Sequence, residues 1–439
     1  MKQTLDFKEF SNSNLEIWKK GVTKELGEKS YESLIWSFDD HLEIEPYYTE
    51  NSDVLDVFAK TSTNWAIKES FEYKSPEILN KSILKSLEGG VNSIEIVLTN
   101  DAKVDFNLLF KNIFVQYIEV FFSGKYANAN TISDYWKYCE SLGLDVASLK
   151  GGLMSFANSN EVDNRVTLQK VRTTSFTFFS IDSSPIQNMG GLASHSLIYA
   201  MIEGERLVQS LICKGQSVGE AIASIRFVFA SEPSYFIEIA KLRAFRTMWA
   251  TIVKTYDPQL DLTDKILIDT KSSAYYQSSV DRHNNLLRAT TQSMSSIIGG
   301  TDSLEVIGFE QSLNKDTEEA RRWARNIQHL LIEESYFNLL KDAAKGSYYI
   351  EEITTKLAEH TWTKFQYWHA KDVSLNESKE WTDELNNCQF ELKKSIDNGS
   401  RVFLGVNKYP NKSETFSNEK ATGNRLVSDF EKRLWEEKK

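Results

Sequence analysis

Cysteine is scarce in this sequence, and the few cysteines lie far apart. Of 439 residues only three are cysteine, Cys139, Cys213 and Cys388, and no two of them form a Cys-x-x-Cys pair. An odd number of scattered thiols argues against a disulfide framework and against a cysteine zinc site. We therefore expect reduced thiols in a reducing compartment.

Long hydrophobic runs and excess positive charge are also lacking. No stretch approaches the roughly 18 apolar residues that a membrane helix needs, and the N-terminus carries acidic residues early, unlike a signal or transit peptide. We expect a cytoplasmic protein. The net charge of −11 gives no general attraction to nucleic acid or to an anionic membrane.

The familiar glycine motifs are absent. The sequence contains no Gly-x-Gly-x-x-Gly, no Gly-x-x-x-x-Gly-Lys-Ser/Thr and no Gly-x-Ser-x-Gly, which removes the usual indications of dinucleotide, nucleotide and serine-esterase chemistry. Because glycine mainly supplies left-handed backbone geometry, four glycine pairs are predicted to form turns after strands or helix ends. They are Gly89-Gly90, Gly151-Gly152, Gly190-Gly191 and Gly299-Gly300.

Histidine is present but has no metal-binding spacing. None of the six histidines forms a His-x-x-x-His or His-Glu-x-x-His pair. His195 and His283 open expected helices, so we interpret them as capping or packing residues. Arg243 and Arg246 share one side of an expected helix; they can contact phosphate, although we favour ion pairs that lock the helix in place.

Short β-branched or aromatic runs alternate with longer helical patterns. Strands are expected at 93–98, 115–122, 175–181, 226–230 and 265–268, and helices at 131–142, 195–213, 235–256, 284–298, 320–340, 349–367, 378–398 and 427–439. Repeated strand-helix alternation favours a parallel α/β sheet, and a closed (β/α)₈ TIM-type barrel holds this many residues in one domain. A doubly wound open sheet is the alternative.

Three regions follow from this pattern. Residues 1–51 are expected to form a helical and extended N-terminal arm, with amphipathic helix within 11–35 and an extended segment at 41–49. Residues 52–370 are expected to form the barrel, and residues 371–439 a charged helical extension. An extended arm needs a surface to lie on, either its own barrel or another chain.

Several strings resemble the barrel of the methylmalonyl-CoA mutase family. The longest are FIEIAKLRAFRTMW at 236–249 and NNLLRATT at 284–291; shorter ones are PYYT at 46–49, GGTDSL at 299–304, ARNIQ at 324–328, EES at 333–335 and LGVNKY at 404–409. The resemblance runs from about residue 15 to residue 410 and keeps the family's order. It is therefore specific.

The resemblance implies a cofactor that this chain lacks the motif to bind. Family members are coenzyme-B12-dependent isomerases that interconvert (R)-methylmalonyl-CoA and succinyl-CoA; acyl-CoA threads the barrel, and a separate flavodoxin-like domain presses cobalamin on its mouth. That domain is marked by Asp-x-His-x-x-Gly. Asp39-Asp40-His41 and Asp281-Arg282-His283 lack the glycine. We expect this chain to bind no cofactor or metal, with adenosylcobalamin in a partner subunit.

The family's reactive loop is also altered. In catalytic chains it reads approximately Gly-Tyr-His-Met-Gln-Glu-Ala-Gly, and alignment without gaps places Ser184 and Pro185 on the Tyr-His pair. A proline ring offers no proton or hydrogen-bond donor. A second family string, approximately Arg-Thr-His-Ser-Gln, falls on 267–271, so Leu267 and Asp269 take its Arg and His positions. A carboxylate there would repel phosphate or carboxylate groups of acyl-CoA.

With these losses, the chain resembles the small, or beta, subunit of the heterodimeric bacterial enzymes. We expect no catalytic residue in this chain, and a heterodimer with a large cobalamin-binding methylmalonyl-CoA mutase subunit. Two alternatives remain open. The chain can be a catalytic barrel that recruits a free-standing cobalamin protein, or an acyl-CoA-binding regulatory barrel.

Overall fold

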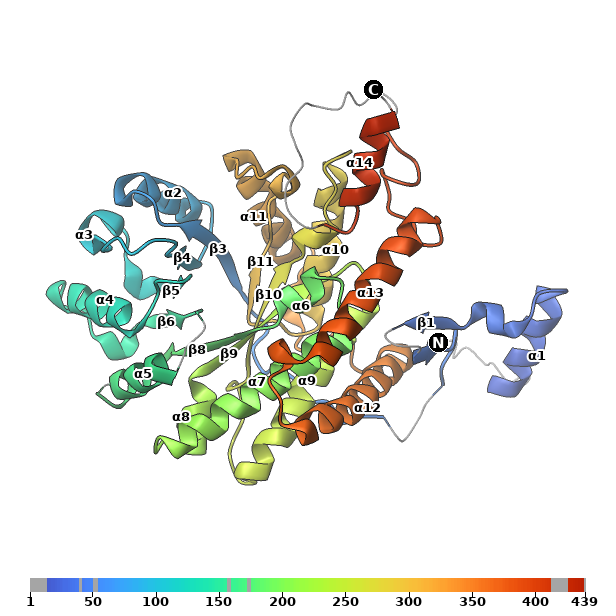
Figure 1. Ribbon diagram of the computed structural model, residues 1–439, viewed down its shortest axis with the longest axis horizontal. Coiled ribbons are helices and arrows are strands. Elements are labelled where there is room, and N and C mark those ends of the chain that lie inside the picture. The colour runs from blue at the N-terminus through green and yellow to red at the C-terminus, as the bar shows by residue number, and fades with distance from the viewer. Residues whose placement is uncertain are drawn as a thin grey trace, which may run out of the picture.

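A parallel β-sheet, rolled into a nearly closed barrel, forms the centre of the molecule (Figure 1). The computed structural model describes residues 14–38, 42–49, 54–155, 159–171, 175–411 and 425–437. In these residues the large sheet has nine strands in the order β7-β6-β5-β4-β3-β11-β10-β9-β8, and every pairing is parallel. The expected TIM-type barrel is confirmed.

The strands of the barrel are short and are separated by helices that cover the outside. The strands are β3 (Ala66–Glu72), β4 (Ser93–Val97), β5 (Glu119–Ser123), β6 (Lys150–Leu153), β7 (Ser175–Thr177), β8 (Phe179–Asp182), β9 (Ile225–Ser231), β10 (Leu267–Ser272) and β11 (Ser303–Glu305). The helices are α2 (Pro76–Glu88), α3 (Phe106–Leu109), α4 (Ala129–Ser141), α5 (Ser159–Val171), α6 (Ser184–Asn188), α7 (Ala193–Cys213), α8 (Val218–Ala223), α9 (Tyr235–Tyr256), α10 (Asn284–Ile298) and α11 (Glu318–Glu333).

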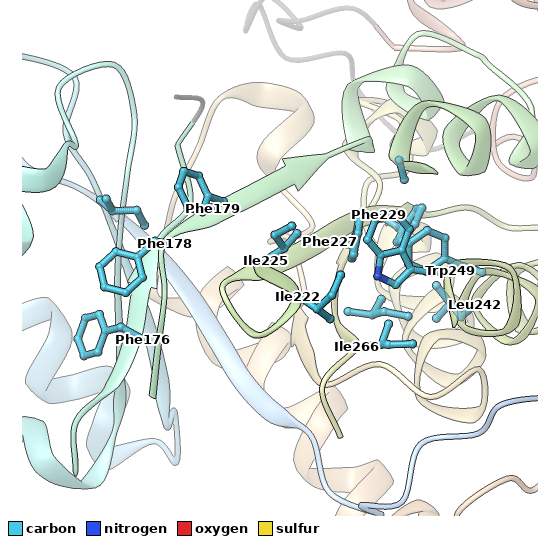
Figure 2. Close-up of a cluster of buried hydrophobic side chains, with 14 of the residues drawn as sticks. Phe176, Phe178, Phe179, Ile222, Ile225, Phe227, Phe229, Leu242, Trp249 and Ile266 are labelled. Atoms are coloured by element: carbon cyan, nitrogen blue, oxygen red, sulfur yellow. The ribbon is translucent and has the colours of Figure 1, made fainter. Parts of the chain in front are cut away.

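The main hydrophobic core lies between the sheet and these helices. Side chains alternate along a strand, so one set faces outward beneath the helices. Phe227 and Phe229 on β9 meet Phe245 of α9, with ring centroids 4.7 and 4.9 Å apart, and Figure 2 shows this layer beside Trp249 and Leu242. Burying this apolar surface supplies the main driving force for wrapping the helices round the barrel.

The barrel has one seam, at Phe178. β7 pairs only with β6 and β8 only with β9, so the fifth strand is in two pieces on either side of this residue. Figure 2 shows Phe178 between the two halves of the wall. Arg165 of α5 is fully buried at this point, and its Nη1 donates hydrogen bonds to the carbonyl oxygens of Ser155 (3.0 Å) and Phe178 (2.9 Å). The expected strand at 175–181 is therefore broken.

One glycine pair does not form the turn that we expected. Gly151 and Gly152 lie inside β6 with φ of +137° and +151°, which L-residues with side chains rarely adopt. A Cβ at either position would collide with backbone carbonyl oxygens of the neighbouring strands, those of Val120 and Thr177. Glycine is thus required by the close approach of β6 to its neighbours.

The expected helices are largely confirmed, and the expected strands only partly. The helices at 235–256 and 284–298 match α9 and α10, whereas the helix expected at 320–340 ends at Glu333. The strand expected at 115–122 begins only at Glu119, after a short 3-10 turn over Val115–Tyr117, and the one expected at 265–268 is β10, shifted to Leu267–Ser272. β3, β6 and β11 were not expected as strands.

The N-terminal arm stands away from the barrel (Figure 1). It consists of α1 (Leu15–Leu26), in which no residue is buried, a 3-10 turn over Tyr31–Leu34, and a hairpin of β1 (Trp36–Phe38) and β2 (Leu42–Ile44). The extended segment expected at 41–49 thus contains β2. Lys356 of α12 (Tyr348–Lys371) anchors it by donating to the Glu43 carbonyl (3.0 Å) and the Tyr48 hydroxyl (3.1 Å).

The C-terminal extension packs back on the barrel. α13 (Lys379–Asp397) crosses α6, and its Gln389 donates a hydrogen bond to the Met189 carbonyl (2.9 Å; Figure 1). α14 (Ser428–Glu437) lies beyond it. Within the described ranges, none of these helices is both long and apolar enough to cross a bilayer.

Replacing Gly152 with alanine should destabilise the barrel strongly, because the new Cβ meets the Thr177 carbonyl. We expect Gly152→Ala to lower the free energy of unfolding by at least about 2 kcal/mol, measured by urea denaturation. Gly143→Ala is the matched control: its φ is also positive, at +75°, but nothing lies within 4 Å of the added Cβ. Its cost should be only about 1 kcal/mol, and equal losses would contradict this account.

Candidate functional site

The interior of the barrel is the first place to look for a site, and its side chains are mostly polar. The strand register directs one row of residues inward. Going round the barrel, this row includes Lys68, Glu95, Phe121, Gly152, Thr177, Ser180, Arg226, Asp269 and Ser303. Small residues thus line one part of the interior, and large charged ones the other.

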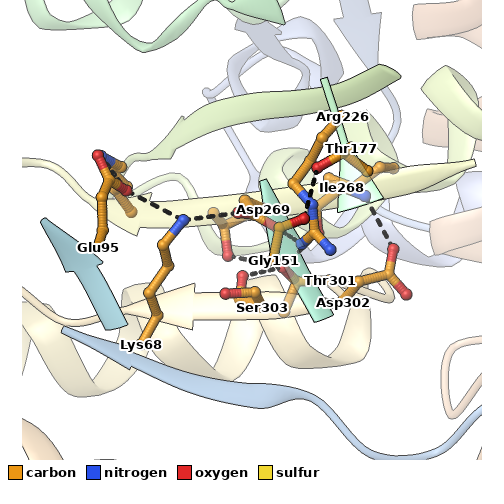
Figure 3. Close-up of polar contacts among 12 residues, drawn as sticks. Lys68, Glu95, Gly151, Thr177, Arg226, Ile268, Asp269, Thr301, Asp302 and Ser303 are labelled. Atoms are coloured by element: carbon orange, nitrogen blue, oxygen red, sulfur yellow. Dashed lines mark hydrogen bonds and ion pairs between the residues drawn. The ribbon is translucent and has the colours of Figure 1, made fainter. Parts of the chain in front are cut away.

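Lys68 of β3 links opposite carboxylates across this interior. Its ammonium group is 3.0 Å from Glu95 of β4 and 3.0 Å from Asp269 of β10, and Figure 3 shows both contacts. The Lys68 and Asp269 side chains are each 1% exposed. Burial alone would lower the pKa of Lys68, but Glu95 and Asp269 outweigh it and raise that pKa.

Asp269 has a second cationic partner, Arg226 of β9, with which it forms an ion pair. Between these charges lies Phe121 of β5, which is fully buried. Its ring centroid is 4.4 Å from the Lys68 ammonium and 4.9 Å from the Arg226 guanidinium. Such cation–π contacts favour keeping both cations over the ring. We call Lys68, Glu95, Phe121, Arg226 and Asp269 the lumen plug.

A further lysine, Lys271, neutralises Glu95 of the lumen plug and the nearby Glu305. Lys271 lies 3.3 Å from Glu305 and 3.8 Å from Glu95. Burial would raise the pKa of Glu95, but Lys271 and Lys68 overcome this and lower it to about 2. The two lysines therefore favour the ionised form of Glu95.

The mouth at the carboxyl ends of the strands contains two cavities. One, of about 790 Å³, is lined by Lys125, Ser180, Asp182, Tyr199 and Glu203 among others. The other, of about 970 Å³, lies over the opposite side and has Glu95, Lys271 and Glu305 in its lining. Barrel enzymes place their chemistry at this end, and here it offers paired charges and hydroxyl groups.

The loop that resembles the family's reactive loop forms the single short helix α6. Pro185 occupies its first turn, where a missing N–H costs little. Pro185 is exposed, while Ser184 is buried and its N–H donates to the Asp182 carboxylate (2.9 Å). Neither side chain presents an acid or base to the interior.

Beneath α6, Gln187 holds a carboxylate pair that consists of buried Glu238 and half-buried Glu232. The Gln187 amide donates to Glu232 (3.1 Å) and Glu238 (3.4 Å), and Lys241 donates to Gln187 (3.0 Å) and to Glu238 (2.6 Å). Burial, and next the charge of Glu238, raise the pKa of Glu232 to about 7. Sequence reasoning gave no sign of this pair.

The expectation for Asp269 needs correction in its physical reason. The residue does not present a lone negative charge, because Lys68 and Arg226 neutralise it. Any obstruction of a ligand would come from the side chains that fill the interior. Leu267, at the other altered position, is only half-buried.

Sequence reasoning missed Lys68, Phe121 and Arg226. Charged residues within short apolar runs were the available signal.

The two arginines of α9 behave as the favoured interpretation proposed. Arg243 pairs with Asp342 (3.1 Å) and Glu351 (2.9 Å), and Arg246 pairs with Asp302 (2.6 Å). Both are buried and lock α9 to its surroundings. They are therefore structural ion pairs and not a phosphate site.

Four of the described histidines make contacts within the fold. The Nδ1 of His195 accepts from the Leu192 N–H (3.2 Å), and the ring of His283 stacks on Phe309 at 5.4 Å, which confirms capping and packing roles. His329 contacts the Gly89 carbonyl (2.8 Å), and His369 approaches Glu205 (3.5 Å). Over the described ranges, no group of three His, Cys, Asp or Glu residues is placed to hold a metal ion. Asp39-Asp40-His41 lies outside those ranges.

Removing one charge of the lumen plug should destabilise the fold. Asp269→Asn leaves Lys68 and Arg226 with a neutral partner in the interior, and we expect a loss of about 3–5 kcal/mol in the free energy of unfolding. The control is Asp134→Asn, in an exposed pair with Lys137, which should change stability by less than about 0.5 kcal/mol. Urea denaturation of both variants checks this, and similar small losses would refute the neutralising role.

The carboxylate pair below α6 should leave a signature in the pH dependence of stability. The folded-state pKa of Glu232 is above its ordinary value of 4.5, so folding favours the protonated form. Its contribution to stability should be full below pH 4.5 and should be lost as the pH rises through about 7. Glu232→Gln should remove this decline and raise stability at pH 8 by about 1 kcal/mol, whereas exposed Glu88→Gln should not. An unchanged pH profile in Glu232→Gln would contradict the assignment.

Comparison with known proteins gives a consistent answer. A family model described as methylmalonyl-CoA mutase matches residues 159–435. The methylmalonyl-CoA mutase small subunit of Porphyromonas gingivalis is 27% identical, over 93% of this chain and 71% of that protein. The methylmalonyl-CoA mutase small subunit of Streptomyces virginiae is 24% identical, over 92% of this chain and 71% of that protein. A methylmalonyl-CoA mutase of Cereibacter sphaeroides is 24% identical, over 90% of this chain and 64% of that protein. With its barrel, its ordered strings and this match over more than half its length, the chain belongs to the methylmalonyl-CoA mutase family.

Proposed function

We propose that this chain is a small, non-catalytic subunit of an adenosylcobalamin-dependent methylmalonyl-CoA mutase. In this role it supports a large subunit that carries out the interconversion of (R)-methylmalonyl-CoA and succinyl-CoA. The reaction class is that of the family, an isomerase, and the cobalamin belongs to the partner. The small-subunit names of two relatives support this assignment.

The lumen plug is the observation that carries the proposal. In a family whose catalytic barrels admit an acyl-CoA along the axis, the interior must leave room for a chain of atoms. Here the Lys68, Asp269 and Arg226 side chains meet across it, and Phe121 lies between them. Moving any one of these charges aside would separate a buried ion pair, which is costly. The interior is therefore unsuited to a threaded substrate.

The altered loop supports the same role independently. A catalytic barrel needs a proton donor beside the substrate carbonyl. Pro185 has none, and it faces solvent. Ser184 is buried, with its backbone N–H committed to Asp182. The filled interior and the altered loop thus both support a non-catalytic role for this barrel.

We assign the contact with the partner subunit to the arm of this chain. We propose a division into an arm (1–51), the barrel (52–370) and a C-terminal extension (371–439). No residue of α1 is buried, and Trp36 on the hairpin is 46% exposed. Exposed tryptophan is enriched in the energetically important parts of interfaces. The arm therefore suits a contact with a large subunit.

Co-expression with a large methylmalonyl-CoA mutase subunit tests the proposal. The tagged chain should co-purify with that subunit and raise its solubility or activity. Trp36→Glu should reduce co-purification at least tenfold without shifting the melting temperature of the isolated chain. Tyr117→Glu, at a residue 79% exposed outside the arm, is the matched control and should co-purify normally. Failure of the unmodified chain to associate would refute the proposal.

Restoring the family histidine alone should not create an enzyme. Pro185→His places a proton donor on α6, but the lumen plug still fills the interior. We expect no methylmalonyl-CoA mutase turnover by this variant, assayed with adenosylcobalamin and a free-standing cobalamin-binding protein. Measurable turnover, either in the variant or in the unmodified chain under the same conditions, would instead favour a catalytic barrel that recruits its cobalamin from a separate protein.

A further inference from the structure

The C-terminal end of the described chain is bound to the barrel mouth in an unusual way. We call residues 425–437 the strap, and we call the surface beneath it the docking face; that surface is made of residues 275–279 after β10, with Ile396, Phe403 and Val406. Leu426 and Val427 of the strap are buried against the aromatic rings of this face. The Leu426 N–H also donates to the Tyr275 carbonyl (2.9 Å).

A buried glutamate is the polar anchor of the strap. Glu431 is 2% exposed and accepts hydrogen bonds from the Ser278 hydroxyl (2.7 Å), the Ser279 N–H (2.9 Å) and the Ser279 hydroxyl (2.7 Å). All three donors are neutral groups. Its ion-pair partner is Arg425, at 2.8 Å, which belongs to the strap itself.

This arrangement differs from the lumen plug in one decisive respect. In the lumen plug, the opposite charges come from different strands, so no element can leave without stranding a buried charge. The strap brings both charges with it. When it departs, the docking face is left with hydroxyls and backbone groups that water can satisfy. The ion pairs that do join the strap to α13, Lys393–Asp429 and Arg433–Asp397, are exposed, so their separation strands no buried charge.

The docking face is held in shape by contacts that do not involve the strap. The Asn285 side chain accepts from the Ser278 N–H (3.0 Å) and donates to the Ser278 carbonyl (2.8 Å). Gln277 donates to the Gly308 carbonyl (3.0 Å) and accepts from the Ser312 N–H (3.2 Å). A preformed surface of this kind can bind a ligand without first having to order itself.

We propose that the docking face is a peptide-binding site at the barrel mouth, and that the strap is its detachable ligand. The class of ligand is a short helix preceded by two aliphatic residues, in a segment that carries its own Arg–Glu ion pair. This inference concerns the isolated chain and does not depend on the proposed partner or on mutase activity. Strap binding covers part of the end of the barrel where barrel proteins bind their ligands.

Cleaving the chain between the strap and the body tests the proposal on the full-length protein. A protease site is placed between residues 412 and 424, the protein is cut, and the fragment is followed by size-exclusion chromatography. We expect the fragment to co-elute at high concentration, to dissociate on dilution, and to leave a folded body. A body that unfolds as the fragment leaves would show that the strap is part of the core, and would overturn the proposal.

Rebinding of a labelled synthetic peptide of residues 425–439 to the stripped body supplies the second measurement. Fluorescence anisotropy should give saturable binding, which Glu431→Gln in the peptide weakens at least tenfold. Lys432→Ala, at an exposed neighbouring position, should leave the affinity unchanged. Because the two charges travel together, adding Arg425→Gln to Glu431→Gln should cause much less than the sum of the separate losses. Absence of saturable binding, equal effects of the 431 and 432 changes, or additive losses would overturn the proposal.

Discussion

Every charge inside this barrel has to be neutralised inside the barrel, because its interior side chains are almost completely withdrawn from water. Lys68 satisfies this requirement for two carboxylates at once, and Arg226 completes the balance at Asp269. The pairs join β3, β4, β9 and β10, so they also set how these strands face one another. The cation–π contacts with Phe121 fill the space that remains. An interior built in this way is a packed core made of polar residues.

The helices of the barrel could be predicted from the sequence, because their apolar faces recur with helical spacing. α9 and α10 were placed to the residue. β3 was missed because its inward Lys68 and its outward Glu69 both interrupt the apolar alternation; Glu69 is buried in an ion pair with Arg325 at 2.9 Å. β6 was missed because a glycine pair, judged from the local sequence alone, predicts a turn. In both strands, tertiary contacts override the local preference.

The candidate site could be predicted only as a set of losses. Ser184, Pro185 and Asp269 were identified by their place in family strings, and the structure adds the contacts that these residues make. Asp269 joins two cations that lie some 40 and 200 positions away in the sequence, Arg226 and Lys68. Pairings over such separations leave no local pattern. The Gln187-held carboxylates escaped prediction for the same reason.

The lumen plug also has an evolutionary consequence. Because its charges are mutually dependent, a substitution that removes one of them leaves another buried without a partner, and the intermediate protein is less stable than either end point. A lineage that has acquired these pairs would need several coordinated changes to recover an open axis. Selection for stability alone would therefore keep these charged side chains in the barrel interior, whether or not a substrate is present.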